Sequence, residues 1–107
     1  MKVLYLSIKR KWFDMILNDE KKEEYREINF YWKSRFNKIL ESSEKMCVEF
    51  RNGYGKKVPT FRIELIGIDI YTGWVEWGAE RGKLYYVLEL GKILKDSKYE
   101  NRQTGSF

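Results

Sequence analysis

The sequence predicts an α+β fold, a small β-barrel of five to six strands with two or three short helices packed against it. Segments with alternating apolar residues, typical of half-buried strands, occur together with two segments whose apolar residues have helical spacing. In residues 61–70 the apolar alternation changes face part-way, which indicates a β-bulge or bend of the kind that turns a strand around a barrel corner. The 107 residues suffice for one domain with a modest core.

The first two elements are expected within residues 3–17. Residues 3–8 form a strand, because Leu4, Leu6 and Ile8 alternate and so share one face. The segment that follows has an apolar helical face made of Trp12, Phe13, Ile16 and Leu17. This spacing predicts a short amphipathic helix.

A second helix is expected to begin after Asn29 and to run to about Leu40. Asparagine is a favoured N-cap residue, because its side chain accepts a hydrogen bond from a free backbone N–H of the first turn. The apolar face of this helix consists of Trp32, Phe36, Ile39 and Leu40. We therefore expect these four side chains to face the core.

Three further strands are predicted in residues 45–51, 61–70 and 85–90. The inward residues are Met46, Val48 and Phe50 in the first, Phe61, Ile63 and Leu65 and then Ile66, Ile68 and Ile70 in the second, and Tyr86, Leu88 and Leu90 in the third. The domain is expected to span residues 1–94. Residues 95–107 are polar and poor in apolar side chains, so this C-terminal tail is expected to fray.

The most informative segment is residues 20–27, in which seven of eight residues are charged. Helix propensity favours a charged helix here, but the segment has no apolar stripe that a helix could bury. Without such a stripe we expect a strand over residues 21–28, in which side chains alternate and Lys22, Glu24 and Arg26 share one face. Such a strand is not expected to be buried on both faces, so one face should line water or a polar cleft.

Composition excludes several kinds of chemistry. The chain has no histidine, which excludes imidazole catalysis, Ser–His and Cys–His pairs and histidine-containing zinc sites. The single Cys47 cannot form an internal disulfide or a thiolate metal cage, and it favours a reducing, cytoplasmic setting. No metal or cofactor is expected. No apolar run approaches the roughly 20 residues of a membrane span, and the net charge of +5 favours a polyanionic partner.

Four short motifs together resemble the ASCH domain of the PUA-like superfamily. They are Leu-Tyr-Leu-Ser-Ile-Lys at residues 4–9, Trp-Phe-Asp-Met-Ile-Leu at residues 12–17, the spacing Lys21-x-x-Glu24-x-Arg26, and Tyr-Tyr-Val-Leu-Glu-Leu at residues 85–90. The resemblance covers residues 1–94 and implies a PUA-like barrel. The turn at residues 18–20 lacks the glycine usual in the family, although Asn18 tolerates the left-handed conformation that ends helices.

The resemblance implies that the chain binds RNA, or a nucleotide-like ligand, in a basic and aromatic-lined cleft between barrel and helices. The residues expected to bind it, with Lys21, are Ser7, Lys9, Tyr25, Arg26, Arg35, Arg51, Tyr54, Lys57 and Trp74. The lysines and arginines among them would contact phosphates, and the aromatic rings would stack on unpaired bases. The loop at residues 51–57 combines a turn signal, one tyrosine and three positive charges, so it suits this role by composition alone.

Two alternatives stay open. Similar proteins include metal-independent hydrolases that act on N4-acetylcytidine or cleave RNA, and here Lys21 matches the family's catalytic lysine while Glu24 stands at its threonine position. Glu76 and Glu80 are the nearest candidates for the family's later glutamate. Carboxylates beside Lys21 are expected to stabilise its charged form and weaken it as a base, and its side chain is expected to bury little. The other alternative is a protein-interaction module whose exposed aromatic residues contact a partner.

Overall fold

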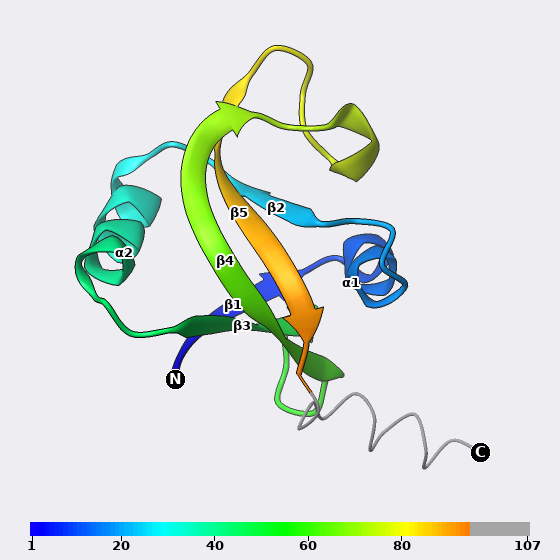
Figure 1. Cartoon of the computed structure of the whole chain (residues 1–107). Helices are drawn as coiled ribbons and strands as arrows, with labels where there is room; N and C mark the ends of the chain where they lie inside the picture. Colours follow the sequence, from blue (N-terminus) through cyan, green and yellow to red (C-terminus); the bar gives the residue numbers. More distant parts are fainter. Residues whose placement is uncertain (95–107) are drawn as a thin grey trace.

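The computed structural model describes residues 1–94; the predicted C-terminal tail lies outside the described residues. In this part of the chain the elements are β1 Lys2–Ile8, α1 Arg10–Leu17, β2 Glu23–Arg26, α2 Phe30–Glu41, β3 Met46–Asn52, β4 Thr60–Thr72, the 3₁₀ turn η1 Val75–Trp77 and β5 Leu84–Ile93 (Figure 1). The predicted α+β class is therefore confirmed. Neither helix of the described residues is long and apolar enough to cross a membrane.

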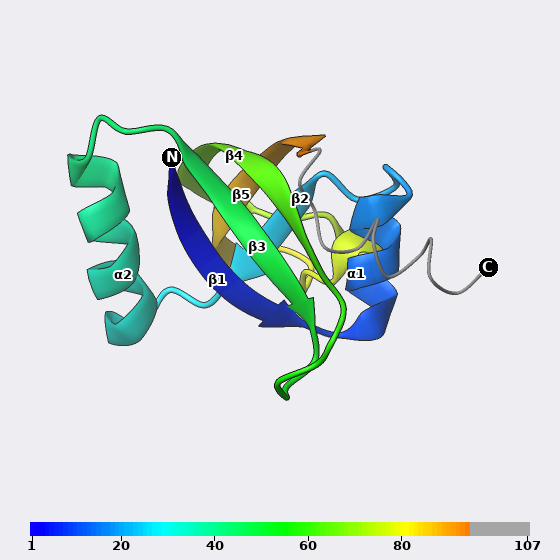
Figure 2. The same cartoon turned by 90° about the horizontal axis from the view of Figure 1, so that it is seen from below.

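The five strands form one mixed sheet in the order β1-β3-β4-β5-β2. β1 runs parallel to β3, and the other neighbours are antiparallel. The sheet curls strongly, and α1 and α2 lie at opposite sides of it (Figures 1 and 2). β1 and β2 are the two edges, with no ladder between them, so the sheet is a half-barrel and not the fully closed barrel that the sequence favoured. We call the gap between these two edge strands the seam.

The core lies inside the curl of the sheet and is closed by both helices. Leu4, Leu6 and Ile8 of β1 are buried as predicted. α1 adds Phe13 and Ile16, and α2 adds Phe36, to the same buried cluster, which also holds Val48, Phe50, Phe61, Ile63, Ile68, Tyr86, Leu88 and Leu90. Asn29 caps α2 as predicted, because its side-chain oxygen accepts the backbone N–H of Trp32 at 2.9 Å.

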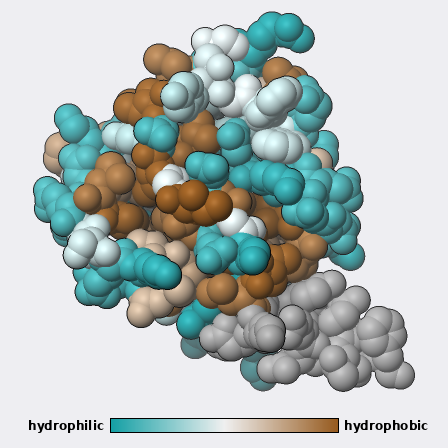
Figure 3. Space-filling model, in the orientation of Figure 1, coloured by the Kyte–Doolittle hydropathy of each residue, from teal (hydrophilic) through white to brown (hydrophobic). Residues whose placement is uncertain are grey.

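The predicted bulge in β4 is confirmed, since the register with β5 shifts on both sides of Leu65. Ile68 is buried beyond the bulge, but Ile66 and Ile70 are exposed, contrary to prediction. Apolar alternation shows which side chains share a face of the sheet, but not whether another element packs on that face. Ile66 and Ile70 belong to neither buried cluster. Figure 3 shows apolar side chains at the surface along the course of β4. Leu40, in the last turn of α2, is exposed as well, contrary to prediction.

Candidate functional site

The predicted charged strand is present as β2, but it is shorter than the sequence suggested and begins at Glu23. The turn before it is fixed by α1, because the backbone N–H groups of Glu20 and Lys21 both donate to the carbonyl of Met15, at 2.8 and 3.1 Å. Asp19, and not Asn18, takes the left-handed conformation in this turn, with φ at 62°. Lys21 therefore precedes the strand, so the alternation of side chains along β2 does not determine the direction of its side chain.

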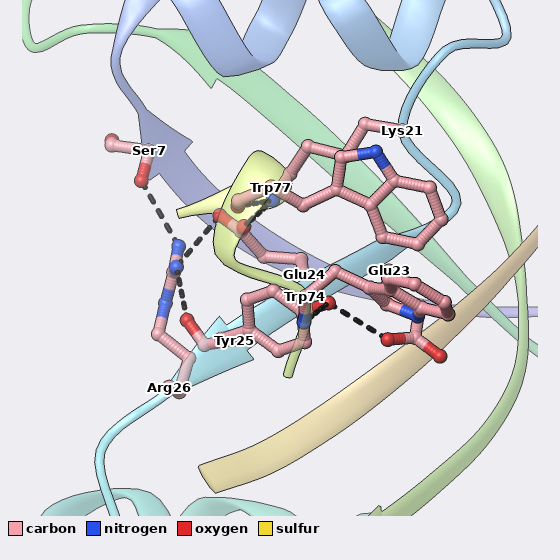
Figure 4. A network of polar contacts seen from close by, with 8 residues as sticks. All are labelled: Ser7, Lys21, Glu23, Glu24, Tyr25, Arg26, Trp74 and Trp77. Atoms are coloured by element: carbon pink, nitrogen blue, oxygen red, sulfur yellow. Dashed lines mark hydrogen bonds and ion pairs between the residues drawn. The ribbon is translucent and has the colours of Figure 1, made fainter. Parts of the chain in front are cut away.

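Lys21 is the partner of Glu24, although strand alternation placed Lys22, and not Lys21, on the face of Glu24. The Lys21 side chain is 0% exposed, and its Nζ lies 3.1 Å from Glu24 Oε1 and donates to the Trp77 carbonyl at 2.5 Å (Figure 4). The ammonium also lies over the rings of Trp12 and Tyr25, at 4.8 and 4.9 Å from their centroids. The expectation that Lys21 buries little is wrong. Lys22 points to solvent near Asp19 instead.

Arg26 joins the two edge strands across the seam. One guanidinium nitrogen donates to Glu24 Oε2 at 2.8 Å and to the Tyr25 carbonyl at 3.0 Å, and the other donates to the Ser7 carbonyl of β1 at 3.1 Å (Figure 4). Arginine suits this position because its planar fork presents several donors in a fixed geometry. A side chain thus bridges the strands where the backbone ladder is missing.

The centre of β2 is buried on both faces, contrary to expectation, although Glu24 and Arg26 still line the polar cavity described below. Glu24 is buried because both of its oxygens meet cations. Tyr25 is buried on the other face, where its hydroxyl donates to Glu23 Oε1 at 2.8 Å and accepts the Trp74 backbone N–H at 2.9 Å. Buried polar groups are tolerated when they are paired in this way.

Burial sets the direction of both pKa shifts in this cluster. The pKa of Lys21 is lowered, because burial penalises the ammonium more than the nearby Glu24 carboxylate stabilises it. This corrects the expectation that carboxylates dominate. Burial also raises the pKa of Tyr25 well above its ordinary value of 10.0. The lowered pKa means that the Lys21 ammonium loses its proton more readily than expected, but this group is sealed from solvent between two acceptors.

A cavity of about 810 Å³ opens at the seam, and this is the candidate site. Its lining residues come from β1, β2, β5, α1, α2, the segments directly after β1, β2 and β3, and the β4–β5 connection: Tyr5, Leu6, Ser7, Ile8, Lys9, Trp12, Glu24, Tyr25, Arg26, Glu27, Tyr31, Trp32, Arg35, Gly53, Tyr54, Gly78, Glu80 and Tyr85. The predicted residues Ser7, Lys9, Glu24, Tyr25, Arg26, Arg35 and Tyr54 are therefore brought together. Its volume lies within the range of ligand pockets, roughly 300 to 1,000 Å³.

Four predicted residues lie outside this cavity. Lys21 is buried behind Glu24. Arg51 lines an adjoining hollow together with Ser7 and Tyr54, and it donates to the Gly55 carbonyl. Lys57 lines neither space. Trp74 also lines neither, and its backbone holds the Tyr25 hydroxyl while its ring packs 5.9 Å from that of Trp77.

The sequence missed most of the aromatic lining, in particular Tyr31 and Trp32 at the start of α2. The Arg35 guanidinium lies 5.7 Å from the Tyr31 ring centroid and 5.2 Å from that of Trp32, and the Arg26 guanidinium lies 5.3 Å from the Trp32 centroid. Helical spacing predicts Trp32 in the core, yet this residue both stacks on Phe36 and reaches the cavity. The sequence did contain one indication of this, because Arg35 follows Trp32 by three residues and the two side chains are therefore neighbours on the helix surface.

The cavity is lined by three cations, Lys9, Arg26 and Arg35, and by three acidic residues, Glu24, Glu27 and Glu80. Glu24 lies between Lys21 and Arg26, and Glu27 pairs with Lys83 at 2.9 Å, so two cations from outside the lining offset its carboxylates. An anionic ligand with an aromatic ring therefore fits the lining better than a cationic one.

Comparison of the chain with family models, with curated proteins and with solved structures finds no match in any of the three.

We predict that Lys21→Met destabilises the fold by about 3 kcal/mol, because it leaves Glu24 with one cation and removes the donor to the Trp77 carbonyl. Lys22→Met is the matched control, since Lys22 is 61% exposed and should change stability by less than about 0.5 kcal/mol. Urea unfolding of both variants measures the difference. Equal stabilities would contradict the burial of the Lys21 ion pair.

Tyr25 makes stability depend on pH above 10. The unfolded chain loses the tyrosine proton near pH 10.0 while the folded chain retains it, so the unfolded state binds fewer protons and stability falls as pH rises further. Against Tyr25→Phe, the wild type should lose about 1.4 kcal/mol more per pH unit in this range. Denaturant unfolding at pH 9 and pH 11 should show a total excess loss of about 1.4 kcal/mol, because the loss begins only near pH 10. Parallel slopes would show that Tyr25 ionises equally in both states.

Proposed function

We propose that this chain is an ASCH-type, PUA-like domain that binds unpaired RNA, or a nucleotide-like ligand, in the cavity at the seam. The observation that carries the proposal is the lining itself, in which aromatic rings and guanidinium groups alternate around one concave space. Single-stranded nucleic acid is recognised by this combination, because every base offers a face for stacking and every nucleotide a phosphate.

Stacking would come from the start of α2. Tyr31 is 59% exposed, and the Arg35 guanidinium already lies against its ring and that of Trp32. Guanidinium planes and aromatic rings both stack on bases, so this group offers adjacent flat surfaces. Tyr54 is 91% exposed on the loop after β3, at another side of the cavity. A ring held only by a loop suits a contact that adapts to the ligand.

Phosphate contacts would come from the opposite end of the seam. Lys9 is exposed at the end of β1 and lines the cavity, and the adjoining hollow holds Arg51 and Lys56. The two spaces share Ser7 and Tyr54, so a strand of nucleotides can pass from one to the other. The net charge of +5 adds a long-range attraction.

Burial of Lys21 favours binding over hydrolysis. A catalytic proton donor or acceptor must come within hydrogen-bond reach of the reacting group, whereas Lys21 is enclosed by Glu24, Trp12, Tyr25 and the Trp77 carbonyl. Its lowered pKa therefore follows from its structural position. We propose that the chain binds without turnover. A protein partner is the remaining alternative, and exposed apolar residues on β4 are its main support.

The proposal is tested by titrating a labelled single-stranded oligouridine at salt concentrations from 50 to 200 mM. We expect micromolar or weaker affinity for the wild type, and we expect the double variant Lys9→Ala, Arg35→Ala to bind about tenfold more weakly. Its salt slope should fall by about 0.7 for each phosphate that the variant no longer neutralises. The matched control is Lys33→Ala, Lys38→Ala, which removes equal charge from exposed positions of α2 outside the cavity.

Two results would contradict the proposal. If both double variants weaken binding equally, the attraction comes from net charge and not from the seam. If the wild type does not bind RNA at low salt, the chain is not an RNA-binding domain.

A further inference from the structure

The peptide groups of β1 alternate between β3 and the seam. Within a strand, the N–H and C=O of one residue point to the same side, and those of the next residue point to the other. The Ile8 carbonyl accepts the Gly53 N–H at 2.9 Å on the β3 side, whereas the Ser7 carbonyl accepts Arg26 across the seam. By this alternation the N–H and C=O of Tyr5 and of Ser7 face the seam.

β1 forms a wall of the cavity, and four consecutive residues, Tyr5 to Ile8, are in the lining. The side chains of Leu6 and Ile8 are packed in the core, at 3% and 6% exposure. Tyr5 and Ser7 lie in the same stretch of lining, with their peptide groups turned into the space.

β2 mirrors this arrangement on the other side of the seam. The Lys22 carbonyl accepts the Leu90 N–H at 3.0 Å on the β5 side, and the Tyr25 carbonyl accepts Arg26 at 3.0 Å on the seam side. Arg26 thus takes up one carbonyl from each edge. In the described part of the chain, no ladder partner lies opposite the Tyr5 N–H and C=O.

We propose that the Tyr5 N–H and C=O bind the Watson–Crick edge of an unpaired base, with the Ser7 N–H beside them. The inference rests on the proposed function and names how the base is recognised. For uracil, a ring carbonyl accepts from the Tyr5 N–H while the N3–H donates to the Tyr5 carbonyl. Each of the common bases carries a donor beside an acceptor on this edge, so the site reads the absence of a base-pairing partner and not the identity of the base.

A base fits this edge better than an added peptide strand. Strand addition needs several consecutive peptide groups along the edge. Here the Ser7 carbonyl is already occupied by Arg26, which leaves the adjacent N–H and C=O of Tyr5 as the one complete pair in the cavity wall. A single donor–acceptor pair matches the width of one base edge.

The test compares uridine 5′-monophosphate with its N3-methyl derivative, which keeps the charge, sugar and stacking face but blocks the N3–H. Both are titrated into the ¹⁵N-labelled full chain and followed by NMR. We expect the unmethylated nucleotide to shift the amide signals of Tyr5 and Ser7 and to bind about tenfold more tightly. Tyr5→Pro removes the N–H without breaking a ladder bond, since that N–H faces the seam, and should weaken binding of the unmethylated nucleotide, because the ring carbonyl loses its donor.

The outcomes separate this inference from the function it rests on. If both nucleotides bind equally well, or if the Tyr5 and Ser7 signals do not move, base-edge reading by β1 is wrong while RNA binding stands. If neither nucleotide nor oligouridine binds, both proposals fail. If those two amides respond only to an extended peptide, the edge accepts a strand and the base-edge proposal is overturned.

Discussion

The Glu24 carboxylate lies between two cations, and the geometry of the seam depends on it. One oxygen meets the Lys21 ammonium and the other meets the Arg26 guanidinium. Lys21 in turn holds the Trp77 carbonyl in the connection between β4 and β5, and Arg26 holds the Ser7 carbonyl of β1. One buried charge thereby links the turn after α1, η1 and both edges of the sheet.

This cluster is better understood as a positioning device than as a source of stability. Desolvating two or three charges costs free energy that their attraction offsets only when the geometry is good. A buried ion cluster therefore seldom stabilises the fold more than apolar residues of similar volume. What charges add is direction, because each donor must meet its acceptor. Lys21 and Arg26 meet theirs from opposite sides of Glu24. The seam is consequently held at a set width without a backbone ladder, which leaves room for the cavity.

Periodicity and local rules were enough to predict the elements but not how the sheet closes or what covers it. The alternation of Leu4, Leu6 and Ile8, the Asn29 cap and the β4 bulge are local properties, and the structure confirms them. Whether another element packs on a given face depends on the tertiary structure. For this reason apolar alternation predicts Ile66 and Ile70 in the interior although they are exposed.

The site was predicted in part for the same reason. The charged motif marked the right segment, yet a strand that begins two residues later than expected exchanges the roles of Lys21 and Lys22. Tyr5 and Tyr31 reach the cavity because β1 and α2 meet the seam from different sides, a relation that single-segment patterns do not contain. Neither the open edge of β1 nor the Arg26 bridge has a signature in the sequence.

Hydrogen exchange of the backbone amides of β1 tests most directly whether the seam is open in the backbone and bridged only by side chains. We expect exchange rates to alternate along β1 under native conditions without ligand, because the N–H groups of Leu4 and Leu6 belong to the ladder with β3 and exchange slowly. The N–H groups of Tyr5 and Ser7 face the cavity and should exchange much faster. Uniform protection of all four amides would mean that β1 has a second strand partner, which would contradict the half-barrel and the site built on its seam.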